Sequence, residues 1–379
     1  MTYLSARSSR RFLQVVAFTW CAVLGATTSG DAHGGDDMAR DAVAAAADSA
    51  VRAPDPYLTS TGTASRRGVE PSSVDQWWFK SLGLDTLVPV PSRPVTVAVI
   101  DSGIDYLHPD FDINALWRNT AEIDNGIDDD GNGYIDDLAG WNFADGSNNP
   151  WDDSGHGTHV AGIIAATRNN GTGISGIHPA ARIMALKVTN AAGYAKSARI
   201  ASAIYYAVDH GAEIINLSLS GEPPPPITVA ALKHAEANDV LVVAAVGNFA
   251  AYAETLGYAA LDTILAVGAI GTEQERAQFS NIGSFIDVVA PGIDVLSLRA
   301  RNTDFILHTQ PAGYSAGAAV VDGGYYLASG TSFAAAMVSG AASFLKSARP
   351  GLTAAQIRNL IEQSAVDLGA LGQDDATGF

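Results

Sequence analysis

The chain follows two alternating hydrophobic patterns from about residue 95 onward. Short runs of continuous apolar residues, rich in Val and Ile, are typical of buried strands. They predict strands over residues 95–100, 182–188, 213–219, 241–246, 264–269 and 286–289. In other segments the apolar residues recur at every third or fourth position, which is typical of amphipathic helices. These segments predict helices over residues 157–167, 197–210, 227–238, 332–347 and 353–364.

The alternation of strands and helices predicts an α/β protein, with a doubly wound, mostly parallel sheet and helices on both faces. In such a sheet, ligand sites gather at the carboxyl ends of the strands. Asp101 directly follows the first predicted strand, so we expect a functional site at that edge. The length of 379 residues allows two domains, but one large α/β domain of about 250–300 residues also fits.

The first 75 residues follow a different pattern. Three arginines between positions 7 and 11 precede an apolar run over 12–26, and small residues follow that run. This pattern predicts a secretory signal peptide over residues 1–30. The run has 15 residues, whereas a membrane span needs roughly 20, so a retained anchor is the less favoured alternative. Residues 31–75 are polar and rich in alanine, which predicts a short pro-segment or N-terminal arm.

Composition narrows the function classes. Hydrophobic residues make up 47% of the chain, enough for a large core, and the net charge is −18. A surface this negative repels nucleic acid and anionic membranes, and it favours solubility and cation binding. The only cysteine, Cys21, lies in the predicted signal peptide, so the secreted chain would have no disulfide. Bound metal is a common substitute for such cross-links.

Three segments each place one reactive side chain beside glycines: residues 97–103 (VAVIDSG), 155–162 (GHGTHVAG) and 329–334 (SGTSFA). Their reactive side chains are Asp101, His156 and Ser332. A serine hydroxyl becomes a good nucleophile when a histidine accepts its proton and a buried carboxylate fixes the tautomer of that histidine. Taken singly, the aspartate fits a turn and the serine fits a helix N-cap. Together, in the order Asp, His, Ser known from subtilisin, they predict a catalytic triad.

With these flanking residues the chain resembles the subtilisin-like (subtilase) serine endopeptidases, most of all their thermitase-like branch, from about residue 55 to its end. The resemblance implies a subtilisin-like fold and a peptidase catalytic domain over residues 76–379. It also implies hydrolysis of peptide bonds through an acyl-enzyme intermediate. In that reaction Ser332 is the nucleophile, His156 the general acid and base, and Asp101 the carboxylate that orients the histidine.

Two further segments match the family. Asn248 follows the predicted strand 241–246, as in the family's oxyanion-hole segment. Its amide and the Ser332 backbone N–H would stabilise the negative charge of the tetrahedral intermediate. Residues 215–221 (INLSLSG) resemble the strand that pairs with extended substrate. The substrate-binding residues that the resemblance implies are Leu217, Ser218, Leu219, Ser220 and Gly247.

The chain also departs from the family. Relatives often carry a globular pro-domain, for which residues 31–75 leave no room, and they continue into a final strand and helix, so we expect a truncated C-terminus. These departures leave open an alternative function, a catalytically impaired calcium-binding surface protein of the same fold. An α/β-hydrolase would need a GxSxG elbow and the order Ser, Asp, His, and a dinucleotide-binding enzyme would need GxGxxG after the first strand. Neither pattern is present.

An acidic segment, residues 124–137 (DNGIDDDGNGYIDD), packs oxygen ligands around glycines. Asp128, Asp130, Asn132 and Asp136 have the spacing of an EF-hand-like loop with glycine in its sixth position, although alanine replaces the closing glutamate. We therefore predict a structural calcium ion in this loop. A solvated acidic loop without a cation is the alternative, but the mutual repulsion of so many carboxylates favours the ion.

The resemblance to thermitase-like relatives implies a second calcium site, which would tie the N-terminal arm to the domain. Its ligands would be the side chains of Asp55, Asp110 and Asn170 and the carbonyls of Thr167, Thr172 and Ile174. His159 invites another metal interpretation, but no ligand set accompanies it, so we expect a packed helix histidine. The sequence thus predicts a secreted, calcium-stabilised, monomeric endopeptidase. It would act on protein or peptide substrates, without nucleic acid and without stable membrane association.

Overall fold

The computed structural model describes residues 50–52, 76–86, 90–221, 223–253, 257–309, 314–369 and 371–379. The predicted signal peptide, Cys21 and Asp55 lie outside these residues, and so does the predicted N-terminal arm except for residues 50–52. Within the described ranges, no helix combines the length and the hydrophobicity that crossing a membrane requires.

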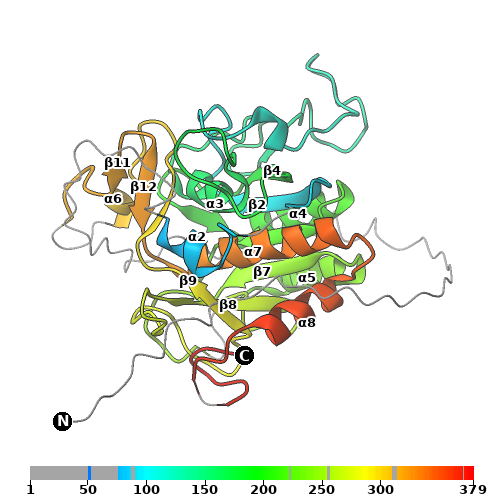
Figure 1. Ribbon diagram of the computed structural model, residues 1–379. Coiled ribbons are helices and arrows are strands. Elements are labelled where there is room, and N and C mark those ends of the chain that lie inside the picture. Colours follow the sequence, from blue (N-terminus) through cyan, green and yellow to red (C-terminus); the bar gives the residue numbers. More distant parts are fainter. Residues whose placement is uncertain are drawn as a thin grey trace, which may run out of the picture.

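A seven-stranded sheet, parallel throughout, forms the centre of the molecule (Figure 1). In spatial order its strands are β3 (Gly140–Asn142), β4 (Ala181–Lys187), β2 (Val95–Asp101), β6 (Ile214–Leu217), β7 (Leu241–Ala245), β8 (Ile264–Ile270) and β9 (Val288–Pro291). The chain adds strands first on one side of β2 and then on the other, so the strand order reverses at β2. At such a switch point the carboxyl ends of the strands open a crevice. Asp101, the last residue of β2, lies there.

Helices cover both faces of this sheet (Figure 1). One face carries α3 (His156–Ala165), α7 (Thr331–Ala348) and α8 (Ala354–Ser364), and the other carries α4 (Ser197–Asp209) and α5 (Pro226–Ala237). Successive residues of a strand point to opposite faces. In β2, Val97 and Val99 therefore join the cluster with α3 and α7, whereas Ala98 and Ile100 join the cluster with α4 and α5. Burial on both faces explains why the strand has a continuous apolar run.

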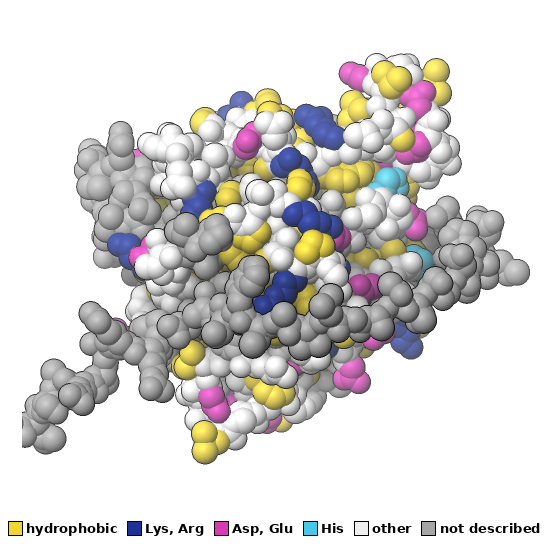
Figure 2. Space-filling model, turned by 45° about the vertical axis from the view of Figure 1, so that its right-hand side comes forward, with side chains coloured by type: hydrophobic (Ala, Val, Ile, Leu, Met, Phe, Trp, Pro, Cys, Tyr) yellow, Lys and Arg dark blue, Asp and Glu magenta, His cyan; other side chains and the backbone are white. Residues whose placement is uncertain are grey.

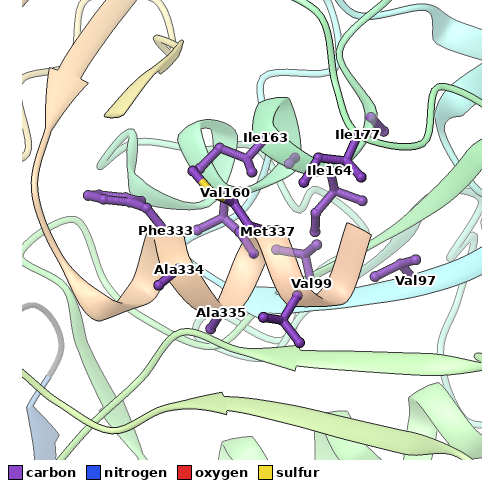
Figure 3. Packing of buried hydrophobic residues seen from close by; sticks show 14 of the residues in the cluster. Val97, Val99, Val160, Ile163, Ile164, Ile177, Phe333, Ala334, Ala335 and Met337 are labelled. Atoms are coloured by element: carbon purple, nitrogen blue, oxygen red, sulfur yellow. The ribbon is translucent and has the colours of Figure 1, made fainter. Parts of the chain in front are cut away.

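Figure 3 shows the packing between the sheet and the two helices that carry the predicted histidine and serine. Val160 and Ile163 of α3, Phe333 and Met337 of α7, and Val99 of β2 belong to one buried cluster. Burying such a side chain contributes about 1.5–3 kcal/mol. This apolar contact fixes the first turns of α3 and α7 relative to the carboxyl end of β2.

The predicted α/β fold class is confirmed, and every predicted strand and helix forms with bounds that agree within two residues. Shorter elements were not predicted. The largest group is an antiparallel sheet of β10 (Val295–Leu298), β12 (Tyr325–Ala328) and β11 (Val320–Val321). The others are β1 (Ala50–Arg52), which pairs with β5 (Tyr194–Lys196), together with β3, α2 (Trp77–Ser81), α6 (Ile306–Thr309) and the 3₁₀ helix η1 (Ile113–Ala115). All of them have five residues or fewer, too few for a hydrophobic period to show.

Candidate active site

Asp101 ends β2 and is buried, with 1% of its surface exposed. Its Oδ1 accepts a hydrogen bond of 2.7 Å from the backbone N–H of Ser102. The chain then turns sharply at Gly103, where φ is +104°. A Cβ atom at this position would lie 2.5 Å from the carbonyl oxygen of Pro150, so only glycine fits. This turn holds the carboxylate at the edge of the sheet.

His156 is the first residue of α3, and its Nδ1 lies 2.8 Å from Oδ1 and 3.0 Å from Oδ2 of Asp101. The two turns that carry these side chains pack backbone against backbone. A Cβ on Gly157 would lie 2.2 Å from the carbonyl oxygen of Gly103. The glycines that flank the predicted histidine therefore allow the close approach of imidazole and carboxylate.

The electrostatics of His156 favour its protonated form. Burial alone would lower the pKa, but the charge of Asp101, its hydrogen bond and the charge of Asp152 outweigh burial, so the pKa of His156 lies above the ordinary 6.5. Nε2 of His156 is buried and has no hydrogen-bond partner among the described residues. This nitrogen is the one that would accept the serine proton.

Ser332 is the second residue of α7, at the end of the helix where N–H groups of the first turn lack intrahelical partners. Its hydroxyl donates to the carbonyl oxygen of Ser218 at 3.2 Å and not to His156. The ring of the next residue, Phe333, lies 5.6 Å from the His156 ring, centroid to centroid. The start of α7 thus packs on the His156 ring through Phe333, and the Ser332 hydroxyl is bound to Ser218.

Asn248 follows β7 and is buried at the start of α7. Its Oδ1 accepts hydrogen bonds of 2.7 Å from both the N–H and the hydroxyl of Thr331, the residue before the predicted nucleophile. Because the N–H and the hydroxyl of Thr331 both donate to this atom, it must be the oxygen of the amide and not its nitrogen. The NH2 group therefore faces the other way, as an oxyanion donor requires.

The predicted substrate strand, residues 215–221, lies against Ser332 and against Gly247, the residue before Asn248. The hydroxyl of Ser218 donates to the carbonyl oxygen of Ser332 at 2.8 Å. Ser220 is half-buried, and its Cβ lies 3.4 Å from the position of a Cβ on Gly247. The side chains of Leu217 and Leu219 are buried in the cluster beneath α4 and α5. Only their backbone atoms are therefore placed to contact a peptide.

Asp152 also lies at this site, although it was not among the residues predicted from the sequence. It is fully buried, and its carboxylate accepts five hydrogen bonds, from Ser102 Oγ, Ser154 N, Gly155 N and the N–H and hydroxyl of Thr158. Burial raises its pKa, and the hydrogen bonds oppose that shift. This carboxylate ties the turn after Asp101 to the turn before His156. In the sequence, only its position four residues before His156 indicated that Asp152 could lie at the site.

Lys187, the last residue of β4, holds the same turn from the other side. Its buried Nζ donates to the carbonyl oxygen of Ser102 and to Asp153, each at 2.6 Å. The parallel register places Lys187 directly opposite Asp101. An apolar strand that ends in lysine is the sequence signal for this contact, and it was missed.

His159 does not take part in the chemistry. Its Nε2 lies 3.1 Å from the carbonyl oxygen of Val295 and 3.0 Å from that of Tyr326, and its ring packs on Phe333 at 4.3 Å. Burial lowers its pKa to about 3, so the ring is neutral and donates its proton to these carbonyls. The structure thus agrees with the expected packed helix histidine, which ties α3 to β10 and β12.

The acidic loop projects at the top right in Figure 1, and Figure 2 shows hydrophobic and acidic side chains on it. Three carboxylates there, the acidic cluster of Glu122, Asp130 and Asp137, have oxygens within 4.8 Å of one another. Among the residues predicted from spacing, only Asp130 belongs to the cluster. Asn132 donates to it, at 3.2 Å to Asp130 and 3.0 Å to Asp137.

The other two predicted ligands of this loop lie outside the cluster and bind backbone N–H groups, as Glu122 of the cluster also does with residues 129, 130 and 136. The carboxylate of Asp128 accepts from the N–H groups of residues 131–133, and that of Asp136 accepts from residues 125 and 126. Short acidic side chains commonly satisfy the amides of their own turn in this way. Glu122, the third member of the cluster, was not predicted, because it lies six residues before Asp128, where the EF-hand-like spacing begins.

At the second predicted calcium site, Asp110 and Asn170 do come together. Nδ2 of Asn170 donates to Oδ1 of Asp110 at 2.6 Å, and the N–H of Ile174 donates to Oδ2 at 2.8 Å. The N–H of Thr172 binds the Asn170 oxygen at 2.9 Å. Burial raises the pKa of Asp110 to about 6. The third side chain, Asp55, lies outside the described residues.

Comparisons with known proteins agree with this geometry. Residues 92–379 match the model of the Subtilase family. Thermophilic serine proteinase from Bacillus sp. (strain AK1) is 36% identical over 73% of this chain and 57% of its own length. Subtilisin DY from Bacillus licheniformis is 33% identical over 73% of this chain and 85% of its own length. The chain thus spans little more than half of the first relative and most of the second.

Among solved structures, that of a cold adapted subtilisin-like serine proteinase matches with a TM-score of 0.59 and 24% identity, over 77% of this chain and 89% of that one. An identity this low supports the fold alone, and the two relatives above carry the sequence argument. The likeness to the thermophilic proteinase also supports the thermitase-like branch. The chain belongs to the subtilase family of serine peptidases.

Proposed function

We propose that this chain is a secreted serine endopeptidase that cleaves peptide bonds through an acyl-enzyme intermediate. The observation that carries the proposal is the buried contact of 2.8 Å between His156 and Asp101, on which Phe333, the residue after Ser332, packs. Family membership supports the same chemistry. Secretion rests on the predicted signal peptide over residues 1–30. The proposed partners are peptide or protein substrates, bound by a monomer.

In the proposed reaction the Ser332 hydroxyl turns from the Ser218 carbonyl toward Nε2 of His156, which accepts its proton as Oγ attacks the scissile carbonyl carbon. The ionised Asp101 stabilises the imidazolium that forms. The amide of Asn248 and the N–H of Ser332 donate to the developing oxyanion. The C–N bond then breaks, and the leaving amine takes the proton from His156. A water molecule, deprotonated by the same nitrogen, hydrolyses the acyl-enzyme.

Substrate recognition is proposed to come mainly from backbone pairing with residues 217–220. An extended peptide that adds to a strand is recognised through main-chain hydrogen bonds, whatever its side chains. Ser220 and Gly247 lie close together at the end of this strand, so the side chain of Ser220 would limit the space for the substrate residue whose carbonyl is attacked.

A peptidyl diphenyl phosphonate tests the proposal, because it forms a covalent bond only with an activated serine. We expect mass spectrometry to find the label on Ser332. The rate of labelling should rise with pH, because only neutral His156 accepts the proton, and its midpoint should lie above 6.5, because the pKa of His156 is raised. Ser332→Ala is the matched control. A label on another residue, or a rate that stays constant from pH 5 to 8, would contradict the proposal.

The alternative of a catalytically impaired calcium-binding protein is not favoured. A protein without catalysis has no need for a buried imidazole with one nitrogen on a carboxylate and the other unpartnered. Both features are present at His156. The phosphonate experiment separates the two functions, since the impaired protein would keep its fold and take no label.

We propose calcium as the structural cofactor, bound first of all at the acidic cluster. Carboxylate and carbonyl oxygens are the ligands that calcium prefers, and the three carboxylates of the cluster repel one another unless a cation lies between them. Asp137 is fully buried, so its charge is poorly screened by solvent. Asp110 and Asn170 would hold the second ion together with Asp55. Asp128, Asn132 and Asp136 stay predictions as ligands.

Removal of calcium is expected to lower the melting temperature of the protein. An ion that binds only the folded state stabilises it by about 2.7 kcal/mol when its concentration is a hundredfold above Kd. The Ser332→Ala variant, which cannot digest itself, should therefore melt several degrees lower in EGTA than in calcium, as measured by calorimetry. No residue of the triad is a proposed calcium ligand, so brief chelation in the cold should leave the initial rate of the unsubstituted enzyme unchanged.

Two further variants separate the ligand sets. Asp137→Asn should reduce the rise in melting temperature that calcium causes, because Asp137 belongs to the acidic cluster. Asp128→Asn should leave most of that rise, because Asp128 binds backbone amides. The reverse ranking would favour the ligands predicted from spacing. Identical melting curves with calcium and with EGTA would remove the calcium proposal.

A further inference from the structure

The oxyanion-hole residue Asn248 stands in a loop after β7, so the position of its amide depends on what holds the loop. Asn281, a buried residue from a distant segment, holds this loop through four hydrogen bonds. Asn281, which lies between β8 and β9, has 1% of its surface exposed. Its N–H donates to the carbonyl oxygen of Gly247 at 3.0 Å, and its Nδ2 donates to that of Val246 at 2.9 Å.

The oxygen of the same side chain binds the other side of the loop. Oδ1 of Asn281 accepts from the N–H of Phe249 at 2.9 Å and from the N–H of Ala251 at 3.2 Å. The four hydrogen bonds therefore bracket Asn248, two on the residues before it and two on the residues after it. No other side chain supplies two acceptor lone pairs and a donor in this shape.

The path of the loop is adapted to this contact. Gly247 has φ of +97°, and a Cβ atom there would lie 2.7 Å from Nδ2 of Asn281. The backbone at Gly247 thus approaches the amide as closely as only glycine allows. On the far side, Thr331 binds the Asn248 oxygen, and its hydroxyl accepts from the N–H of Gly247 at 3.2 Å, so Thr331 holds the side chain while Asn281 holds the loop on both sides of it.

We infer that Asn281 is a positioning residue for the oxyanion hole: it holds the peptides on both sides of Asn248 so that this amide points at the scissile carbonyl oxygen. The inference rests on the proposed function. Donors of an oxyanion hole act because they are in place before the charge develops. A displacement of about 1 Å in such a group costs roughly a hundredfold in rate.

Asn281→Asp is the sharpest test, because it keeps the size of the side chain and the acceptor for Phe249 and Ala251, but sets an oxygen against the carbonyl of Val246. With a chromogenic peptide substrate, we expect kcat to fall about 10- to 100-fold while KM changes less than about twofold. The affinity for a peptide aldehyde, which forms a tetrahedral adduct on Ser332, should fall in parallel with kcat.

A double-mutant cycle with Asn248→Ala separates positioning from general damage. If Asn281 acts through Asn248, its substitution should change kcat by no more than about threefold once the Asn248 amide is gone. An equal loss in both backgrounds, or a loss carried by KM, would overturn the inference. Ser280→Ala is the matched control: its hydroxyl accepts from Ala269 in β8 at 3.1 Å and reaches only the backbone carbonyl of Asn281, at 3.4 Å, so it should lower the melting temperature and leave kcat unchanged.

The same cycle is measured with Asn281→Ser in place of Asn281→Asp. The serine variant serves as the test if the aspartate variant does not fold. The shorter hydroxyl loses two or more of the four bonds and should give the same pattern. Failure of the inference is distinct from failure of the proposed function. If the unsubstituted protein hydrolyses the peptide and takes the phosphonate but the cycle is additive, only the inference on Asn281 is wrong.

Discussion

Replacement of Ser332 by alanine is expected to lower the kcat of peptide hydrolysis about a thousandfold or more, because the hydroxyl is the attacking atom. The neighbouring hydroxyl of Thr331 is bound to Asn248, so it is not placed to take over the attack. The folded state should change little, because the Ser332 hydroxyl makes a single hydrogen bond of 3.2 Å, to the Ser218 carbonyl. Stopped assays with a chromogenic peptide and a melting curve measure both effects.

The control for this variant is Ser339→Ala, which removes a buried hydroxyl from the same helix. Ser339 Oγ donates to Asn216 at 2.9 Å and does not touch the reacting atoms. It should cost stability and leave most of kcat. If Ser332→Ala kept more than about a thousandth of the wild-type rate, the nucleophile would have to be sought elsewhere.

Asp101→Asn is expected to reduce kcat about 10⁴-fold, the effect of the equivalent change in the chymotrypsin-type triad. The geometry gives the reason. The N–H of Ser102 would keep the oxygen of an asparagine amide at the position of Oδ1, so its NH2 would take the position of Oδ2, 3.0 Å from Nδ1 of His156. This NH2 favours the tautomer with the ring proton on Nε2, which cannot act as a base, and the amide carries no charge to stabilise the imidazolium.

Asp112→Asn, at an exposed carboxylate, is the matched control and should behave like the unsubstituted enzyme. A loss in Asp101→Asn that came entirely from KM would mean that the carboxylate binds substrate and does not orient the imidazole. Rates measured across the pH range should show a lower plateau, because of the wrong tautomer, and a midpoint at lower pH, because the charge of Asp101 no longer raises the pKa of His156.

The long elements and the contact between Asp101 and His156 could be predicted from the sequence for two reasons. A strand such as β2 is buried on both faces and shows a continuous apolar run, and the turns near these two residues require glycine at positions 103, 155 and 157. The antiparallel sheet of β10, β11 and β12 could not be predicted, because its pairing joins short segments across a long loop. No local period records such a pairing.

The polar residues that support the site were missed for a similar reason. The carboxylate of Asp152 binds Ser102, 50 residues away, and the amide of Asn281 binds Val246, 35 residues away. The sequence shows that an aspartate and an asparagine are present, but not which donors they meet. In the acidic loop the EF-hand-like spacing could not reveal that nearby backbone amides bind Asp128 and Asp136, whose role as ligands stays a prediction.

The two hydrogen bonds between Asn248 and Thr331 have a mechanical consequence. They couple the oxyanion donor to the residue next to Ser332, while Asn281 ties the loop of that donor to the segment between β8 and β9. On its other side the first turn of α7 packs on the His156 ring through Phe333. A displacement of this turn would strain contacts on both sides, so the fold resists changes in the spacing of the nucleophile, the base and the oxyanion donor.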